Sequence, residues 1–492
     1  MITSEGTEAL IALEDAEPAI LFEPLPGTDV AAWPLMRWLV ARATAETELK
    51  TVVVPKAISR QQTLARGLNR VMPNPHSASR ISKRAAALFI VAGGTQSQTP
   101  LGVRNWLVDY AAAALGDEAV VVQDAPIPRS APQNERPILR NTYSFEDSMV
   151  DVEIAAKFAP PRKGDLDSAR ALVRGVFEQL DFDVSAELIA SVERRFVLRF
   201  RRARHTLRHF ESLLDRVDPE IIFMQTAAYG DRSHLINAAK RRGIAVAEHQ
   251  HGWIGPSHAA YNYGKAMSNP KLRDYMPDTL LTFGEFWSEQ VRFPGRKIAV
   301  GKPHLDKLTA HVMPVGLRDK VVLVASSVLE PEEMARFTLS VRDALPADWR
   351  ILFRPHPSER SSLHARYPLL VNAERVEFDR SLDVYESLAS VRAVFGVAST
   401  VLYEALAFDC PVYVKQSRLS DLYIDDILGA RVETAEDLAR AVADISNAES
   451  ADAFGVDRSR MERVWKPHPT ASFKAFANQA ITRARLSGSE SP

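Results

Sequence analysis

The chain has 492 residues, of which 46% are apolar and 25% are charged, and its 61 basic side chains nearly balance its 62 acidic ones. A chain of this length is too long to fold around a single hydrophobic core, so we expect two or three domains. The formal net charge of −1 argues against a protein whose main task is to coat nucleic acid.

Two features of the sequence bear on where the protein works. The first 17 residues are acidic and lack the basic and apolar pattern of a secretion signal. Nowhere do 18 uncharged apolar residues occur in a row, which is about the length that a membrane-spanning helix needs. The single cysteine, Cys410, lies in an apolar run, which favours a buried small hydrophobe over a reactive thiol. We therefore predict a cytoplasmic protein, with contact at the inner face of the membrane as a further option.

The first 165 residues carry the weakest patterns of the chain. Residues 18–22 and 51–54 are predicted to be strands on either side of an amphipathic helix, which would make a βαβ beginning. Residues 88–92 and 119–122 are two further apolar runs of strand length. These patterns predict a parallel sheet but point to no chemistry.

A strongly basic helix is predicted after Ser185. Its apolar residues recur at three- and four-residue spacing, so one face packs against the protein and the other carries arginines. Such a helix either lies on an anionic membrane or polyanion, or packs in the core with its arginines solvated and paired. The arginines are Arg194, Arg195, Arg199, Arg201, Arg202, Arg204 and Arg208.

A regular alternation of strands and helices follows from residue 218 to residue 300. Apolar strands are predicted at 220–224, 244–250, 280–283 and 297–300, with a helix from Ser233 to Arg242 that ends at Gly243. This alternation is typical of a parallel sheet covered by helices.

A second α/β domain is predicted after a linker in which prolines and glycines interrupt the pattern. We divide the chain into residues 1–302, a linker at 303–319, a domain at 320–460, and a terminal helix at 461–492 that packs back on the first domain. The second domain should contain strands at 321–325, 350–353, 376–378, 393–397 and 411–414, and helices near 331–344, 383–390, 400–408 and 434–445.

The residues with the clearest chemistry follow two strands of the second domain. Arg354 and His356 are held on a stiff loop by Pro355 and Pro357, and an arginine and a histidine there suit an anion. A turn with a surface arginine and a capping histidine is the alternative.

The second of these strands leads into a helix. Ser399 is a good N-cap for a helix that starts at Thr400, and a helix start is itself an anion site. Glu404, one turn on, is either a ribose-binding carboxylate or a solvated helix residue.

Histidines mark the end of a strand in the first domain. His249 and His251 are predicted to point to one face of that strand, and Gly252 permits close approach of a ligand or another backbone. His251 is our candidate general base, while a core or supporting role remains open for both histidines. A zinc site would need further ligands that the sequence does not place, so we expect no metal.

These motifs together resemble the two-domain GT-B glycosyltransferases, above all bacterial capsule-polysaccharide transferases, HP-motif sialyltransferases and CDP-glycerol glycerophosphotransferases. The similarity covers about residues 220–415, and one departure is Val397-Ala398 where many relatives have a glycine pair before the Ser-Thr helix. The motifs are Gln250-His251-Gly252, Val300-Gly301-Lys302-Pro303 with Asp306, Arg354-Pro355-His356-Pro357, Ser399-Thr400, Glu404-Ala405 and Cys410-Pro411-Val412.

The resemblance implies two Rossmann-like α/β domains that face each other across a cleft. It implies an enzyme that moves a sugar, or a polyol phosphate, from a nucleotide-activated donor to a hydroxyl of a cell-surface glycan or lipid-linked acceptor. No metal or other cofactor would be required. The acceptor side would include His249, His251 and Gly252.

The same resemblance assigns a role to each donor-side residue. Arg354, His356, Ser399 and Thr400 would hold the donor phosphates, and Glu404 would bind the ribose. His251 would take the acceptor proton, and His356 would stabilise the leaving phosphate.

Two rival functions share this fold. A non-hydrolysing nucleotide-sugar 2-epimerase has the same two-domain pattern, but it needs additional carboxylates that the sequence does not identify. A non-catalytic nucleotide-binding protein is the rival from another class.

Overall fold

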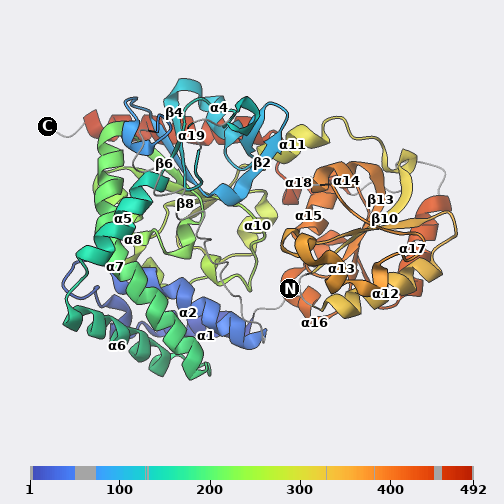
Figure 1. Cartoon of the computed structure of the whole chain (residues 1–492), viewed down its shortest axis with the longest axis horizontal. Helices are drawn as coiled ribbons and strands as arrows, with labels where there is room; N and C mark the ends of the chain where they lie inside the picture. Colours follow the sequence, from blue (N-terminus) through green and yellow to red (C-terminus); the bar gives the residue numbers. More distant parts are fainter. Residues whose placement is uncertain are drawn as a thin grey trace. The chain divides into compact units, whose positions relative to one another are not determined.

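The computed structural model describes residues 4–49, 74–127, 129, 132–327, 330–381, 383–447 and 457–489 (Figure 1). The chain divides into two compact units. The N-terminal unit comprises Ser4–Phe283, Ser288–Pro303 and His468–Pro492, and the C-terminal unit comprises Gly284–Trp287 and His304–Pro467.

A parallel sheet organises the N-terminal unit. Within the described residues it has the strand order β5-β4-β1-β6-β7-β8-β9, and every neighbouring pair is parallel. Its central strands are short apolar runs, as expected when both faces of a parallel sheet are covered. The strands are β1 (Ala87–Val91), β4 (Ala119–Gln123), β5 (Thr142–Ser144), β6 (Ile221–Met224), β7 (Ala245–His249), β8 (Thr279–Thr282) and β9 (Arg296–Ala299), with a separate antiparallel hairpin of β2 (Gln96–Thr99) and β3 (Gly102–Asn105).

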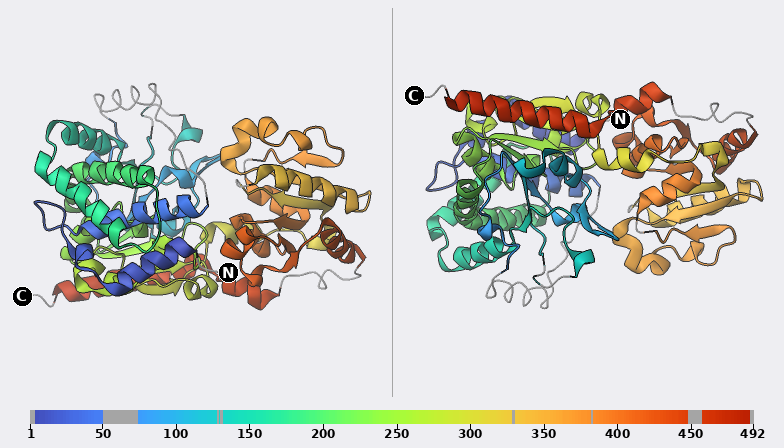
Figure 2. Two further views of the ribbon diagram at one scale, coloured as in Figure 1. Left: turned by 90° about the horizontal axis from the view of Figure 1, so that it is seen from below. Right: turned by 90° about the horizontal axis from the view of Figure 1, so that it is seen from above.

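Helices cover both faces of this sheet. Leu88 packs with residues of α7 and α8, while Phe89 faces the other way and packs with α4 and α19. On α19 the ring of Phe473 lies 4.7 Å from that of Phe223, and Figure 2 shows this helix running along the unit. The helices are α1 (Glu5–Ala16), α2 (Ala32–Glu48), α4 (Asp109–Leu115), α5 (Glu146–Phe158), α6 (Lys163–Gln179), α7 (Ala186–Val217), α8 (Ser233–Arg241), α9 (Pro270–Arg273) and α19 (Pro469–Ser489).

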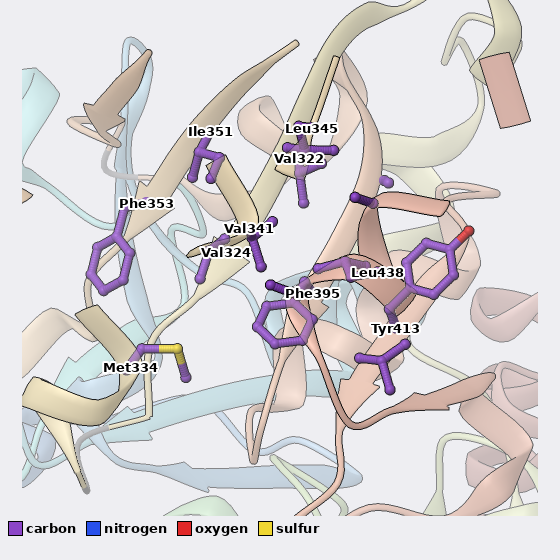
Figure 3. Packing of buried hydrophobic residues seen from close by; sticks show 14 of the residues in the cluster. Val322, Val324, Met334, Val341, Leu345, Ile351, Phe353, Phe395, Tyr413 and Leu438 are labelled. Carbon is purple, nitrogen blue, oxygen red and sulfur yellow. The ribbon is translucent and has the colours of Figure 1, made fainter. Parts of the chain in front are cut away.

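The C-terminal unit is built on a second parallel sheet, which has the order β12-β11-β10-β13-β14-β15 among the residues described. One face packs against α12 and α17, as Figure 3 shows for Val324 and Phe395 of the sheet with Met334 and Leu438 of the helices. Helices α14 and α15 contact strands of the same sheet. The strands are β10 (Asp319–Ala325), β11 (Arg350–Arg354), β12 (Val376–Phe378), β13 (Val391–Gly396), β14 (Val412–Lys415) and β15 (Ala430–Val432).

Two units of parallel α/β structure confirm the predicted Rossmann-like fold class. The predicted strands and helices of the second domain are confirmed within two residues at nearly every boundary. The remaining helices are α10 (Glu285–Glu289), α11 (Pro303–Thr309), α12 (Pro331–Ala344), α13 (Leu363–Arg366), α14 (Val384–Ser390), α15 (Thr400–Ala407), α16 (Arg418–Tyr423), α17 (Ala435–Asn447) and α18 (Arg458–Val464).

Two predictions about local structure are wrong. Residues 18–22 do not form a strand: Ala19–Phe22 is a 3-10 helix, because the Leu21 N–H bonds to the Pro18 carbonyl at 3.0 Å and closes a local turn. The predicted strand at 51–54 lies outside the described residues.

The predicted linker contains helix α11. Pro303 starts this helix instead of interrupting it, because a proline is well suited to the first helical position.

The basic helix α7 is packed by other helices along much of its length. It contacts α2, α5, α6 and α8, and its apolar residues Phe196, Phe200 and Phe210 are buried. Some of its arginines have protein partners: Arg199 donates to the Leu35 carbonyl at 2.6 Å, and Arg202 pairs with Glu153 at 2.6 Å. The exposed arginines are Arg194, Arg204 and Arg208.

Candidate functional site

The C-terminal unit has its topological switch point between β10 and β13. The chain moves outward from β10 through β11 to β12, then returns to place β13 on the other side of β10. The two strands end level, because Ala325 is paired with Gly396. Ligands of open α/β sheets bind beyond the carboxyl ends of strands at this point. The loops that follow are Ser326-Ser327 and residues 397–399.

Ser399 and Thr400 lie at this switch point. Ser399 is the N-cap of α15, and its hydroxyl accepts a hydrogen bond from the Val401 N–H at 3.3 Å, as predicted. Thr400 is exposed at the first helical position. Gly396 lets the strands close tightly here, since an added Cβ would lie 3.2 Å from the Ala325 carbonyl oxygen. The start of α15 therefore presents backbone N–H groups and two hydroxyls to the loop region.

Arg354 is the last residue of β11, and its guanidinium is buried. It forms an ion pair with Asp379 in which the two side chains are 8% and 4% exposed. Asp379 also accepts a hydrogen bond from the Ser387 hydroxyl at 2.7 Å. The pair offsets the charge that we predicted would hold a phosphate, and a role of Arg354 toward a ligand stays a prediction.

His356 lies two residues further along and is exposed. Its Nδ1 accepts a hydrogen bond from the Ser358 N–H at 3.3 Å, and Glu359 accepts one from the His356 N–H at 2.9 Å. Because Nδ1 is an acceptor, the neutral ring carries its proton on Nε2. Partial desolvation lowers the pKa of His356 from its ordinary value, and Glu359 opposes that effect. An exposed Nε2–H donor on a fixed loop suits a phosphate oxygen.

A buried network that sequence reasoning missed fixes the His356 loop. The Glu359 carboxylate accepts hydrogen bonds from the Ser326 hydroxyl and the Tyr367 hydroxyl, both at 2.8 Å, and from Arg366 at 2.5 Å. Ser326 follows β10, so the network ties the loops after β10 and β11 together. The available signal was the glutamate three residues after His356, which is the spacing of a capping box.

Glu404 is 9% exposed on α15, so it is not the solvated residue of our alternative interpretation. Its Oε1 accepts a hydrogen bond from the Tyr385 hydroxyl at 2.8 Å. The Tyr385 ring stacks on Phe408, with ring centroids 5.8 Å apart. Burial and the nearby Glu404 raise the pKa of Tyr385 well above its ordinary value, so the phenol stays a donor. Tyr385 thereby orients the carboxylate one turn below the start of α15.

The N-terminal unit has a matching switch point between β1 and β6. The chain runs from β1 outward to β4 and β5, then returns to β6 and continues through β7. The Gln225 side chain bridges the two strands by accepting a hydrogen bond from the Ala92 N–H at 2.8 Å. The loop after β6 contacts the carboxyl end of β7, since the Ala228 N–H donates to Glu248 of that strand at 2.7 Å.

His251 follows β7 and lies beside Glu248, a buried carboxylate of that strand. Its Nδ1 lies 3.8 Å from Oε1 of Glu248 and 3.5 Å from the hydroxyl of Tyr261. Tyr261 donates to the same Glu248 oxygen at 2.6 Å. The Glu248 side chain is fully buried, whereas that of His251 is 20% exposed. The three side chains form a hydrogen-bonded cluster, which we call the Glu248 cluster, and His251 is its exposed member.

Burial shifts both titrating groups of the Glu248 cluster. Desolvation raises the pKa of Glu248 to about 7, against the opposing hydrogen bonds from Tyr261 and Ala228. Desolvation lowers the pKa of His251 to about 4. His251 is therefore neutral at neutral pH, which is the form that a general base needs, and Glu248 changes its charge in the working range.

Aromatic side chains surround His251, and sequence reasoning missed them. The Tyr229 ring lies 5.7 Å from that of His251 and 4.5 Å from that of Trp38. His258 stacks between Trp38 and Trp253, at 5.7 and 5.8 Å. All of these rings are half-buried, so they present apolar faces at the edge of the sheet. Trp38 and Tyr229 come from elsewhere in the chain, so the spacing of residues around His251 did not predict their approach.

His249 and Gly252 differ from our expectations in their surroundings. Strand β7 ends at His249, so His251 lies beyond it and the argument from a shared strand face does not apply. His249 is 4% exposed and its Nε2 donates to the Gly301 carbonyl at 3.1 Å, while burial lowers its pKa to about 4. A Cβ on Gly252 would meet no atom within 4 Å, so the space beside it is open.

In the part of the chain that the structure describes, no group of three or more His, Cys, Asp or Glu side chains is arranged to hold a metal ion. Among the same residues, no helix is both long enough and apolar enough to cross a membrane. The predicted metal independence stays a prediction.

No family model and no curated protein matches this chain. Among solved structures, it is similar to the UDP-GlcNAc 2-epimerases of Methanocaldococcus jannaschii (14% identity, TM-score 0.42, 80% of this chain and 99% of that one) and Rickettsia bellii (12%, 0.41, 82% and 97%). It is also similar to a glycosyltransferase from Rickettsia africae (9%, 0.45, 82% and 99%). The neighbours thus include both activities, and identities of 9–14% do not decide between them.

Proposed function

We propose that the protein is a glycosyltransferase that uses a nucleotide-activated donor. The observation that carries this proposal is the edge around the β10–β13 switch point, where Ser399, Thr400 and the start of α15 follow β13, and the His356 loop follows β11 at the same edge of the sheet. These groups offer hydrogen-bond donors to an anion, and Glu404 lies one turn below them as an acceptor for a diol. A nucleoside diphosphate joined to a sugar or a polyol phosphate has both features.

We assign the donor contacts to residues of the C-terminal unit. The Nε2–H of His356 and the N–H groups at the start of α15 bind the phosphates, and the Glu404 carboxylate accepts from the ribose hydroxyls. Arg354 acts through its ion pair with Asp379, which fixes the end of β11 and hence the His356 loop. A hydrogen bond to a charged group contributes roughly 1.5–3 kcal/mol, so three or four such contacts give useful affinity.

The acceptor is activated by the N-terminal unit. Its hydroxyl oxygen forms a bond to the transferred group, the bond from that group to the donor phosphate breaks, and the nucleotide leaves with the bonding electrons. His251 takes the hydroxyl proton, and the nearby Glu248 carboxylate stabilises the imidazolium that forms. The aromatic rings around His251 offer apolar faces to the acceptor, which we propose to be a glycan or a lipid-linked saccharide.

A nucleotide panel tests the donor half of this proposal. UDP, GDP, CDP and CMP are compared in a thermal-shift assay, since a ligand that binds only the folded state adds about 2.7 kcal/mol of stability at 100 times its Kd. We expect one base to raise Tm, and the matching nucleotide-sugar to release free nucleotide when an acceptor is present, with or without EDTA. No shift with any nucleotide would overturn the proposal.

The Glu248 cluster favours one alternative, a nucleotide-sugar 2-epimerase. Such an enzyme needs a carboxylate for proton transfer at carbon, and Glu248, with its pKa raised to about 7, is a group of that kind. NMR of the protein with UDP-GlcNAc and no acceptor separates the two activities. An epimerised sugar still joined to UDP indicates the epimerase, acceptor-dependent release of UDP indicates the transferase, and binding without turnover indicates a nucleotide-binding protein.

A further inference from the structure

An exposed turn joins α5 to α6 on the N-terminal unit. We call residues 154–163 the basic turn. Phe158 is 79% exposed and Ile154, one helical turn before it, is 50% exposed. Exposure of large apolar side chains to water is unfavourable, and a group of them on a folded surface often marks a site of contact with a protein or a membrane.

The charges of the basic turn all have one sign. Lys157, Arg162 and Lys163 are exposed, and residues 154–163 contain no acid. The preceding acid, Glu153, is ion-paired with Arg202 of α7 at 2.6 Å. The Lys157 ammonium lies 5.9 Å from the Phe158 ring, so a cation and an aromatic share the tip.

Two of these cations stand where helix formation alone disfavours them. Arg162 is the N-cap of α6, makes no side-chain capping hydrogen bond, and is followed by Lys163 at the first helical position. The positive end of the helix dipole favours acids at such positions, and Ser, Thr, Asp or Asn is the usual cap. Local stability therefore does not account for this choice of residues, whereas an external anion would.

The neighbouring helix α7 adds exposed arginines beside the basic turn. Arg204 donates to the Ala159 carbonyl in the basic turn and is exposed, and Arg208 lies one helical turn further along and is also exposed. Leu198 of α7 is 41% exposed. It lies one helical turn before Arg202, which pairs with Glu153 of α5. Three helices thus contribute five exposed cations to this surface: Lys157 of α5, Arg162 and Lys163 at the start of α6, and Arg204 and Arg208 of α7.

We propose that this surface binds the face of an anionic lipid bilayer. Aromatic and aliphatic side chains enter the boundary between headgroups and acyl chains, and Lys and Arg attract anionic headgroups. The proposal is independent of the enzymatic activity, because the basic turn shares no residue with either switch point. It also narrows the two interpretations of the basic helix: part of α7 is packed and paired, and only its Arg204–Arg208 portion faces the lipid.

Vesicle flotation tests the proposal with the full-length protein. Vesicles of phosphatidylcholine alone are compared with vesicles of phosphatidylcholine mixed with phosphatidylglycerol. We expect binding only to the anionic vesicles, and weaker binding as salt rises. The charge-reversal variant Lys157→Glu/Arg162→Glu/Lys163→Glu should lose more than roughly 100-fold in affinity, at about fivefold for each cation removed, and Phe158→Ser roughly tenfold.

Matched variants separate the basic turn from general charge and exposure. Lys265→Glu/Lys271→Glu reverses two exposed lysines of the same unit, and Leu101→Ser replaces a side chain that is 73% exposed on the β2–β3 hairpin. Both should bind vesicles like the unchanged protein, and circular dichroism should show all variants folded. Equal binding to neutral vesicles, equal loss in the control variants, or binding to polyglutamate but not to anionic vesicles would overturn the proposal.

Discussion

The two units share a topology but differ in the chemistry at the carboxyl edge of their sheets. Each has a parallel sheet with one switch point, between β10 and β13 in the C-terminal unit and between β1 and β6 in the N-terminal unit. The C-terminal edge carries hydroxyls, a helix start and the exposed imidazole of His356, all of which can donate hydrogen bonds to an anion. The N-terminal edge carries aromatic rings, neutral histidines and a carboxylate that titrates near neutrality. Under the proposed function, the C-terminal edge is the anion-binding edge and the N-terminal edge is the reacting edge, so the same topology serves two roles through different side chains.

Removal of the imidazole of His251 should have the largest effect on the reacting edge. His251→Ala should lower turnover by roughly 10² to 10⁴, the usual contribution of a general base, and leave the nucleotide Kd unchanged. Steady-state rates and calorimetry on the same preparation check this. Near-normal turnover would remove His251 from the base role.

The buried ion pair at the anion-binding edge should matter most for stability. Asp379→Ala leaves the Arg354 guanidinium buried without its partner, which should cost about 3–5 kcal/mol in urea unfolding. The exposed pair of Arg350 on β11 with Glu377 on β12 is a control, and Glu377→Ala should cost less than about 1 kcal/mol. If Arg354→Ala weakens nucleotide binding as strongly in the folded protein as His356→Ala does, Arg354 contacts the phosphate directly.

The titration of Glu248 should make the reacting edge sensitive to pH. Its folded pKa, about 7, is above its ordinary value of 4.5, so its contribution to stability is complete below pH 4.5 and is lost as pH rises to 7. Over that range the unchanged protein should lose roughly 3 kcal/mol relative to Glu248→Gln. Urea unfolding of both proteins at a series of pH values measures the difference, and parallel curves would contradict the shift.

The carboxylate at the anion-binding edge should give a smaller effect that concerns affinity. Glu404→Ala should weaken nucleotide binding roughly 10- to 100-fold, because a charged acceptor for the ribose hydroxyls is lost. Tyr385→Phe keeps the carboxylate but removes the hydrogen bond that orients it, so its effect should be weaker. Calorimetry with a ribonucleotide and its dideoxy analogue is the measurement. Unchanged affinity in Glu404→Ala would end the ribose assignment.

Local sequence determined much of the C-terminal unit. Its strands are short apolar runs and its helices have amphipathic patterns with clear starts, as at Ser399 and Pro331, so their boundaries follow from period and capping. In the N-terminal unit the same reasoning failed at Ala19–Phe22, where an apolar run closes a local turn. An apolar run of four or five residues does not by itself distinguish a strand from a turn of helix.

The electrostatics of the candidate site were decided by tertiary structure. Arg354 has the same neighbours in sequence whether it binds a ligand or not, but the fold brings Asp379 to it from 25 residues away. Glu248 is an ordinary glutamate in sequence, and its burial in the folded chain raises its pKa to about 7, against the opposing hydrogen bonds from Tyr261 and Ala228. The sequence determined which residues end the strands. The folded chain determined which charged side chains are paired and which side chains have shifted pKa values, because both depend on burial and on partners distant in sequence.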